Sequence, residues 1–495
     1  MSTRDAMDGD RFEAGPVIRA GLARGVALFN RGDHWGSHEA WEGAWHVAEA
    51  QDRDFLQGLI QAAAAMHKLR VQDNPRGARI LLSRALQRLE PLPPEHHGVA
   101  LAALRTQLAG WKHELAAHGT SSFEGSLRGL PNIAWSAEGR AARLRVEELR
   151  VHPVAVGDHQ ALVIEVHAQG RRGWAECPLP WQRQGTRRSI ERVLGPALLA
   201  EPVAAPSALP LRWQGMAEDP FAAAALESAV WDLWARVMGW SLHQAMGLTT
   251  RRLPLAATVQ GVGEGTLRAD AEHLADLGYA ELVFPARPGA DRRLLPPLVA
   301  AAGSRYSFDL GRAYRPADLY ALQALAATGP AALLRPVPRS NLHEAVRLRR
   351  WLDVPVVAAA AQDLGEGEAQ MGLGATDELL IDPLRCGPTA ALELAEAAAT
   401  HGIPARMRAH ARTPIGAGNA LAVAMHLAFT KPADVGRAPD SADEGLAALG
   451  AAWPAPESDG CLAAASWFDA GPLMNARRDE WLAAVASGPA TRQRI

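Results

Sequence analysis

Lysine is nearly absent from this sequence. The chain has 495 residues, of which 51 are Lys or Arg, yet its lysines are limited to Lys68, Lys112 and Lys431. Residues 119–430 therefore contain none. Lysine is a common acid, base or Schiff-base nucleophile in enzymes. We therefore expect no lysine-based chemistry in that long segment.

Cysteine is also scarce. Cys177, Cys386 and Cys461 are far apart and odd in number, and none belongs to a Cys-x-x-Cys pair. This spacing excludes a disulfide framework and a cysteine-rich zinc site, and it favours a reducing compartment. We expect a cytoplasmic protein.

Long apolar runs and an excess of charge of one sign are missing too. The longest apolar run lies around Val354 to Ala361, and MSTRDAMDGDRFEAG at the start has no apolar core of a signal peptide. The net charge of -3 gives no basic surface for nucleic acid. We expect neither a membrane nor a nucleic acid as partner. The length predicts two to four domains.

The first 118 residues have a helical pattern throughout. Apolar residues recur at three- and four-residue spacing, and Gly, Asp, Asn or Pro occupy the connections. The expected helices are Phe12 to Phe29, His34 to Ala50, Arg53 to Leu69, Pro75 to Leu89 and His97 to His118. This pattern predicts an all-α helical bundle at 1–118, followed by a Gly- and Ser-rich linker at 119–142.

The rest of the chain alternates short apolar strands with helices. Three strand-like segments and a long helix predict an α+β capping domain at 143–250. Seven further strands, each followed by a helical segment, predict a parallel (β/α) barrel at 251–430. We expect residues 431–495 to return to the capping domain.

Three segments of this second half resemble the enolase superfamily, specifically its o-succinylbenzoate synthase and N-acylamino acid racemase branch. They are ALVIEVHAQGRRGWAECP at 161–178, DPFAAAALESAVWDLWARVMGWSLHQAMG at 219–247 and TPIGAGNALAVAMHLAF at 413–429. They occur in the family's order. The resemblance therefore implies an enolase-type barrel with its capping domain.

The resemblance also implies a reaction. Family members remove a proton next to a carboxylate, using lysines as acid and base and a magnesium ion held by three acidic residues. In this sequence the matching positions, in strand order, are Val283 and Pro285, Asp309, Leu334, the region of Ala359 and Ala360, the region of Asp382, and the region of Arg412. One acidic ligand, Asp309, remains, and neither lysine does. The ordinary reaction is therefore expected to be lost, and magnesium is expected only if the barrel is active.

Arginines replace the acidic site. Arg335, Arg339, Arg385, Arg408 and Arg412, together with His410, lie at or near predicted strand ends. The carboxyl ends of barrel strands form the site-bearing face, and arginine binds carboxylate or phosphate through two parallel hydrogen bonds. We interpret the group as a binding site for an anionic small molecule. The alternative is that these arginines pair with local acids, Asp309 among them, or face solvent.

The segment from Phe29 to Leu82 resembles a bacterial and archaeal family known as domain of unknown function 309. The matching residues include His38, Glu39 and Glu42, the stretch LQGLIQ, and His67. That family brings no established activity.

Several polar residues of this helical region share one helical face. His34, His38, Glu42 and His46 recur every four residues, with Glu39 beside them. The next helix offers Gln57, Gln61 and His67. We interpret these groups as a structural or binding network, and a metal site is the alternative.

Three hypotheses follow. The first is a non-catalytic barrel, fused to a helical domain, that binds an anionic small molecule or a protein partner. The second is an active synthase-like dehydratase or racemase in which Asp309, Asp382 or His410 serves as acid or base. The third is a metal-dependent activity of the helical domain that uses His38, Glu39 and Glu42. Since barrels of this family commonly self-associate, we expect a homo-oligomer.

Overall fold

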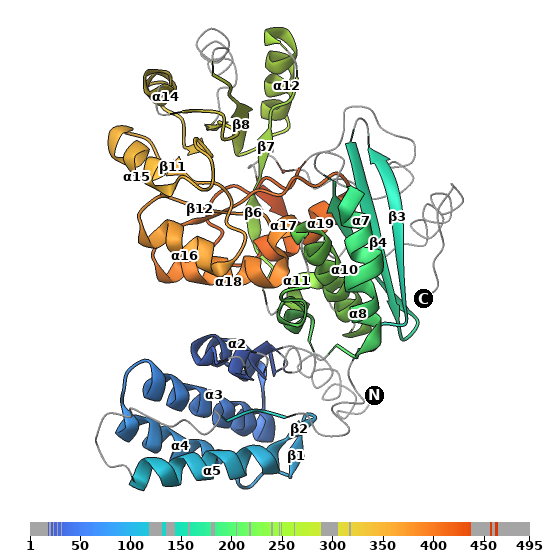
Figure 1. Cartoon of the computed structure of the whole chain (residues 1–495), viewed down its shortest axis with the longest axis vertical. Helices are drawn as coiled ribbons and strands as arrows, with labels where there is room; N and C mark the ends of the chain where they lie inside the picture. Colours follow the sequence, from blue (N-terminus) through green and yellow to red (C-terminus); the bar gives the residue numbers. More distant parts are fainter. Residues whose placement is uncertain are drawn as a thin grey trace, which may run out of the picture.

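The computed structural model describes residues 18–117, 131–134, 144–179, 184–436, 456–457 and 461–463, with breaks inside these ranges, the longest at 289–304. The start of the first predicted helix, most of the predicted linker and most of 431–495 lie outside the described residues. Figure 1 shows a helical bundle beside a larger α/β part. The predicted order of an all-α bundle, a capping domain and an enolase-type barrel is confirmed.

The bundle is built on one central helix. Its helices are α2 (His34–Val47), α3 (Ala50–Arg70), α4 (Pro75–Leu89) and α5 (Leu101–Ala117), preceded by helical residues within 18–30. Helix α3 packs against α2 and α4, and α5 packs against α4. Asp33 caps α2 and Asn74 caps α4, each accepting a hydrogen bond from the backbone N–H three residues on.

A short hairpin interrupts the predicted fifth helix. The strands β1 (Glu95–His96) and β2 (Val99–Ala100) pair antiparallel around a two-residue turn. The prediction that a helix begins at His97 is wrong, because His97 (φ 46°) and Gly98 (φ 76°) both adopt left-handed backbone conformations. Helix α5 therefore starts only at Leu101.

Part of the predicted linker is attached to the bundle. The backbone of Ile133 forms hydrogen bonds in both directions with the side chain of Asn30, at 2.8 and 2.9 Å. Ile133 itself is buried in the bundle core. Residues 131–134 thus belong structurally to the helical domain.

The capping domain contains an antiparallel sheet backed by a long helix. Its strands are β3 (Glu148–Val156), β4 (His159–Ala168) and β5 (Arg171–Pro178). Helix α10 (Pro220–Met238) packs against β4 and β5. The smaller helical elements of this region are α7 (Gln184–Ser189), the π-helical turn Ile190–Leu194, α8 (Gly195–Ala200), the 3-10 turn Pro206–Ala208, α9 (Leu209–Arg212) and α11 (Leu242–Ala245).

Parallel strands form the barrel. They are β7 (Ala256–Thr258), β8 (Glu281–Pro285), β9 (Tyr306–Asp309), β10 (Leu333–Leu334), β11 (Val356–Val357), β12 (Leu379–Ile381) and β13 (Ala405–Met407). The first five form one sheet, and β12 pairs with β13. Isolated parallel bridges join these strands to the neighbouring segments: Ala361 to Ile381, Ala405 to Phe429, Arg408 to Asp434, and Leu255 to Ala433. Hydrogen-bonded neighbours therefore lead from β7 round to residues 433–434 and back to β7, slightly beyond the predicted end at residue 430.

Helices alternate with these strands and flank them in Figure 1. They are α12 (Glu264–Asp276), α14 (Leu319–Ala326), α15 (Leu342–Trp351), α16 (Leu364–Gly372), α17 (Pro383–Cys386), α18 (Pro388–Thr400) and α19 (Pro414–Ala424). The described C-terminal strand, β14 (Cys461–Ala463), pairs with β6 (Arg252–Pro254) at the start of the barrel.

The inside of the barrel is apolar. Six buried side chains form one cluster: Ala256, Val283, Ala332, Leu334, Val357 and Leu380. Two of them, Val283 and Leu334, occupy positions where the family resemblance implies a lysine and a glutamate. The strands thus enclose a layer of apolar side chains at the level where the family resemblance implies a lysine and a glutamate.

A buried charge network lies at the end where the strands begin. The guanidinium of Arg406 contacts Glu281 and Glu378, each at 2.6 Å. Lys431 contacts Glu378 at 2.8 Å. Since Glu378 precedes β12 and Asp382 follows it, Lys431 lies at the end of the barrel opposite the strand carboxyl ends.

An ion pair among the described residues joins the bundle to the barrel. Arg24 of the first helical residues contacts Glu396 of α18 at 2.5 Å. Across the described residues, no helix is both long enough and apolar enough to cross a membrane.

The close approach of β5 to α10 yields a stability prediction. A Cβ at Gly173 would lie 2.3 Å from the carbonyl oxygen of Ala229 and 2.4 Å from the amide nitrogen of Leu233, both backbone atoms of α10. Gly173→Ala should therefore lower the free energy of unfolding by about 1–3 kcal/mol, as overpacking does. Urea denaturation measures this change in the free energy of unfolding. The control Gly265→Ala, on α12 with open space around it, should be neutral or stabilising; equal stability of both variants would contradict the packing argument.

Candidate functional site

The residues predicted for the barrel site do meet at the strand carboxyl ends, which we call the mouth. Asp309 at the end of β9 is the cross-strand neighbour of both Pro285 and Leu334. Asp382 directly follows β12, and His410 lies three residues beyond the end of β13. The register thus places Asp309 between the two positions where the resemblance implies a lysine and a glutamate.

Two arginines hold the carboxylate of Asp309. Arg335, directly after β10, donates from Nε to Oδ1 at 2.9 Å and from its second terminal nitrogen to Oδ2. Arg408, directly after β13, reaches Oδ2 at 2.7 Å. Burial alone would raise the pKa of Asp309, but the charges of Arg408 and Arg335 outweigh it and hold that pKa well below its usual range. Asp309 is therefore a fixed anion.

Arg408 is buried and shared among several partners. Its guanidinium donates to the hydroxyl of Thr258 at 3.1 Å and lies 3.4 Å from a carboxylate oxygen of Asp434. The Thr258 hydroxyl in turn donates to Asp434 at 2.6 Å. The end of β7, the end of β13 and the closing segment at 433–434 are thus joined at the mouth by one polar network.

The backbone at Arg335 is strained. Its φ of 52° lies in the left-handed region, which costs a non-glycine residue on the order of 1 kcal/mol. Hydrogen bonds on both sides hold this conformation, because the Arg335 N–H donates to Val357 and its carbonyl accepts from Arg312, each at 2.7 Å. This turn lets Arg335 follow an apolar strand and still reach Asp309.

Asp382 differs electrostatically from Asp309. Its side chain accepts a hydrogen bond from the backbone of Leu384 at 3.2 Å, as the N-cap of α17. Withdrawal from water raises its pKa to about 7, although that hydrogen bond and the nearby Arg385 and Arg335 act in the opposite direction. Asp382 can therefore gain or lose a proton near neutral pH.

His410 reaches solvent from the mouth, but protein atoms crowd its inner side. This desolvation, together with the positive charges of Arg408 and Arg335, lowers its pKa to about 3. The imidazole is neutral at physiological pH. It can donate one hydrogen bond and accept another, but it is a weak base.

The remaining mouth arginines divide into paired and unpaired groups. Arg339 forms a two-pronged ion pair with Glu366. By contrast, the Nε of Arg385 is buried and has no hydrogen-bond partner among the described residues. Arg412 forms no side-chain ion pair within the described part of the chain; burial lowers its pKa, and Glu176 opposes that shift. Arg335, Arg408 and Arg339 thus pair with local acids, whereas the described residues show no ion pair for Arg385 or Arg412, which are both partly exposed.

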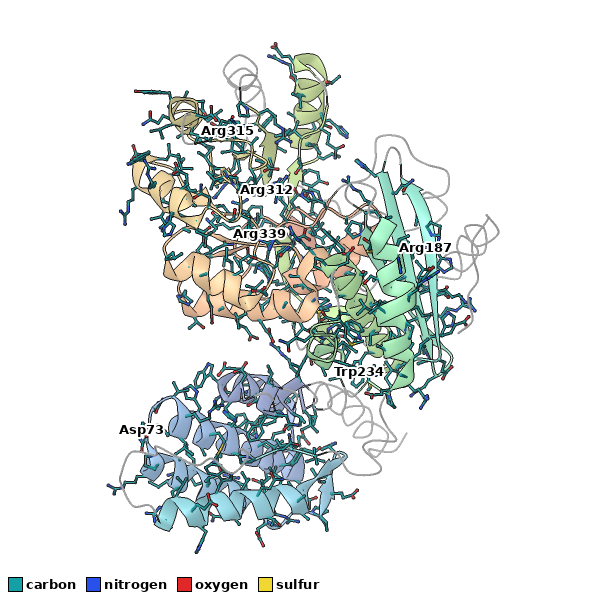
Figure 2. All side chains as sticks on the ribbon, in the orientation of Figure 1. Asp73, Arg187, Trp234, Arg312, Arg315 and Arg339 are labelled. Carbon is teal, nitrogen blue, oxygen red and sulfur yellow. The ribbon has the colours of Figure 1, made fainter. Side chains whose placement is uncertain are left out.

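Arg312 was missed by the sequence analysis. It follows β9 in a left-handed conformation (φ 63°), is exposed, and lies close enough to affect the pKa values of Arg335 and Arg385. Figure 2 labels Arg312 and Arg339, which both come from segments that follow barrel strands. The sequence signal was present, since Arg312 comes three residues after Asp309.

The capping domain contacts this mouth through a buried carboxyl. Glu176, at the end of β5, accepts hydrogen bonds from the backbone N–H groups of Arg412 and Thr413 and from the Thr413 hydroxyl, each at 2.7 Å. Burial raises its pKa to about 7 despite these donors. Thr413 is the N-cap of α19. Glu176 thus fixes the backbone of Arg412 at the edge of the mouth.

These residues do not fit a magnesium site of the kind the resemblance implies. Mg²⁺ needs oxygen ligands in near-octahedral geometry. Asp309 provides the one carboxylate at the three implied ligand positions, and two guanidinium groups already occupy its oxygens. Leu334 and the Ala359 region provide none.

In the helical domain, the predicted cluster is only partly assembled. The Nδ1 of His38 lies 3.1 Å from Glu39 and 3.8 Å from Glu42. The ring of Trp35 stacks on His38 at 5.1 Å and lies 5.4 Å from that of His67. His38, Glu39 and Glu42 each offer a ligand atom, all within 4.8 Å of one another.

The other predicted members lie apart from this group. His34 is buried against Phe29, and burial lowers its pKa to about 4, so it is neutral. The amide oxygen of Gln61 is buried without a hydrogen-bond partner among the described residues. His46 lies against Trp45 instead. The four-residue repeat therefore mixes core and surface positions.

The raised pKa of Asp382 predicts a pH-dependent stability. Because the folded state binds this proton more tightly than the unfolded chain, the free energy of unfolding should fall as pH rises from about 4 to 7. Asp382→Asn keeps the acceptor oxygen and should lessen this slope by at most about 1.4 kcal/mol per pH unit. Urea denaturation at several pH values measures this slope for the native chain and for the variant. Identical slopes for both proteins would contradict the assignment.

Comparison with known families agrees with this architecture. Residues 22–81 match the family described as domain of unknown function (DUF309), and residues 140–247 match the mandelate racemase / muconate lactonizing enzyme N-terminal domain.

Curated relatives and a solved structure cover the second half. An o-succinylbenzoate synthase from Geobacillus kaustophilus is 31% identical over 39% of this chain, which spans about half (54%) of that protein. An N-succinylamino acid racemase from Thermus thermophilus is 28% identical over 60% of this chain and 85% of its own length. A dipeptide epimerase structure from Enterococcus faecalis V583 superposes with a TM-score of 0.54 at 22% identity, covering 59% of this chain and 90% of that one. The chain thus joins a DUF309 region to a region of enolase-superfamily fold that is related in sequence to o-succinylbenzoate synthases and N-succinylamino acid racemases.

Proposed function

We propose that the barrel is a non-catalytic member of this group that binds an anionic small molecule at its mouth. The observation that carries the proposal is the double ion pair of Asp309 with Arg335 and Arg408. It occupies the one carboxylate left at the implied metal positions. It therefore leaves a mouth built from guanidinium groups where family members are expected to hold a cation.

The unpaired arginines supply the binding groups. The Arg385 Nε lacks a partner among the described residues, and the side chain of Arg412 forms no ion pair there. A buried donor without a partner costs roughly 1–3 kcal/mol, and a ligand carboxylate or phosphate would satisfy it. Neutral His410 adds a polar group that does not repel an anion. These features favour a ligand with one or two carboxylate or phosphate groups.

The same geometry argues against proton abstraction by the usual route. Residues 119–430 contain no lysine, and Lys431 is bound to Glu378 at the opposite end of the barrel. Asp309 is too weak a base because its pKa is lowered. His410 is a weak base for the same reason.

An active enzyme is the second candidate, and one observation favours it. Asp382 follows the strand on which the resemblance implies the second lysine, and its pKa of about 7 suits a general acid or base. In that case Asp382 would exchange the proton while Arg385 and Arg412 hold the substrate carboxylate.

Calorimetric titration tests anion binding. Succinate and inorganic phosphate serve as probes, with the full chain and with Arg385→Gln and Arg412→Gln. Each variant should bind at least one probe roughly tenfold more weakly, because it loses a hydrogen bond to a charged group. The matched control is Arg268→Gln on α12, whose exposed side chain pairs only loosely with Glu264; it should bind as the native chain does. Absence of binding, or equal affinities throughout, would refute the proposal.

Turnover assays separate the two candidates. The purified chain is incubated with Mg²⁺ and either an N-succinylamino acid or the substrate of an o-succinylbenzoate synthase. We expect no turnover above a protein-free control, because both implied lysines are absent and Asp309 and His410 are weak bases. Turnover that Asp382→Asn abolishes would instead establish the second candidate.

A further inference from the structure

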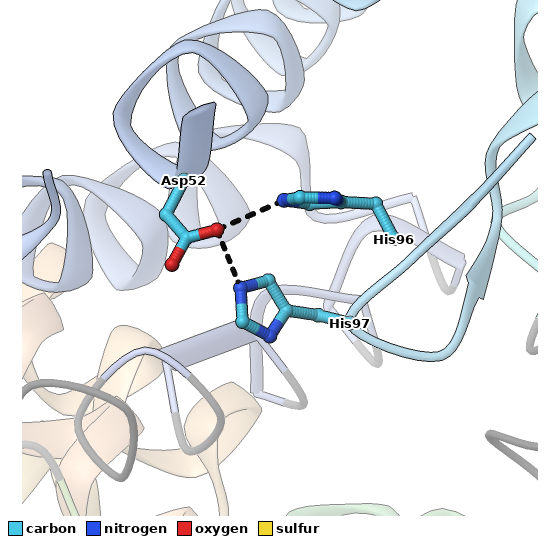
Figure 3. A group of neighbouring side chains, drawn as sticks. All are labelled: Asp52, His96 and His97. Atoms are coloured by element: carbon cyan, nitrogen blue, oxygen red, sulfur yellow. Dashed lines mark hydrogen bonds and ion pairs between the residues drawn. The ribbon is translucent and has the colours of Figure 1, made fainter. Parts of the chain in front are cut away.

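The hairpin that interrupts the predicted fifth helix brings two histidines to one carboxylate. His96 ends β1 and His97 begins the turn, while Asp52 lies in the first turn of α3. Figure 3 shows both imidazoles directed at the same carboxylate oxygen. Neither the barrel nor the His38, Glu39 and Glu42 group is part of this cluster.

The distances are short and specific. The Nε2 of His96 lies 2.9 Å and the Nε2 of His97 lies 2.8 Å from Oδ1 of Asp52. The three ligand atoms all lie within 4.8 Å of one another. Ligands of a tetrahedral metal ion stand about 3.3 Å apart when the bonds are about 2.0 Å long. A small adjustment of these side chains would therefore surround an ion.

His97 is not satisfied by hydrogen bonding alone. Its Nε2 is buried and has no hydrogen-bond partner among the described residues, although it lies 2.8 Å from Asp52, because the approach is not along a hydrogen-bond direction. A buried ring nitrogen normally has such a partner. This atom therefore has a lone pair or proton that no described residue uses.

The turn also maintains His97 in an unfavourable conformation. A two-residue hairpin turn with both central φ values positive favours Asn-Gly, and here the pair is His97 (φ 46°) and Gly98 (φ 76°). A histidine in this position costs local stability. Asparagine would suit this turn better than histidine does.

Aromatic packing fixes the two rings. His96 and His97 pack edge to face, with centroids 4.8 Å apart, and Phe55 lies edge-on to His96 at 4.8 Å. The side chains stay partly open to solvent, at 14% for His96, 23% for His97 and 33% for Asp52. An ion could enter from solvent and keep one coordination position for water.

We propose that Asp52, His96 and His97 bind a divalent transition-metal ion of the zinc type. Two imidazoles and one carboxylate are a ligand set that suits Zn²⁺ and Co²⁺ better than Mg²⁺ or Ca²⁺. Three protein ligands leave the fourth position open. The site is separate from the barrel mouth and does not depend on the function proposed for it.

The decisive variant is His97→Asn. Asparagine tolerates the left-handed conformation and restores the preferred Asn-Gly turn, so the metal-free protein should melt at the same temperature or higher. It lacks the imidazole, however. The full chain should show visible Co²⁺ absorption typical of tetrahedral coordination and a rise in melting temperature with Zn²⁺. His97→Asn should lose both signals.

A second background separates the two candidate metal groups. His38→Ala removes the key ligand of the other cluster and should keep the Co²⁺ absorption and the Zn²⁺-dependent stabilisation. Asp52→Asn, in contrast, should lose them. The proposal is overturned if the native chain shows neither signal, or if His97→Asn retains both while His38→Ala abolishes them. A third result also overturns the proposal: the metal-free His97→Asn variant is destabilised and the native chain binds no Co²⁺. His97 would then only hold the hairpin against α3.

Discussion

The ion pairs of Asp309 with Arg335 and Arg408 are the constraint on which the mouth of the barrel depends. A buried carboxylate needs compensating charge, and breaking such a pair by removing one partner typically costs about 3–5 kcal/mol. The neighbouring strand positions, Pro285 and Leu334, carry no charge and cannot compensate it. The arginines must therefore come from the next strand and from across the barrel, and the strained backbone at Arg335 is a consequence of that demand.

The barrel separates its charges into two groups, one at each end. At the mouth, arginines surround Asp309; at the other end, Arg406 lies between Glu281 and Glu378, and Lys431 joins them. The apolar cluster around Leu334 and Val283 fills the space between. The carboxylates of Asp309 at one end and of Glu281 and Glu378 at the other thus each have an arginine partner.

Much of this architecture could be predicted from the sequence. The short apolar runs locate the barrel strands, and the absence of lysine from 119–430 needs no structure to be seen. Other features depend on three-dimensional closure. Thr258 and Asp434 are 176 residues apart and meet only because β7 and the closing segment are neighbours. The hairpin at His97 depends on two backbone angles, which a helical apolar pattern from residue 97 onward conceals.

The apolar cluster inside the barrel also limits how the chain can change. A lysine introduced at position 283 would place its side chain in a cluster whose other members are all aliphatic and offer no carboxylate. A glutamate at position 334 alone would compete with Asp309 for Arg335. Each single replacement is thus unfavourable, and only a concerted set of exchanges would be tolerated. The protein therefore occupies a local optimum in sequence space, separated by several simultaneous substitutions from lysine-bearing barrels of the same fold.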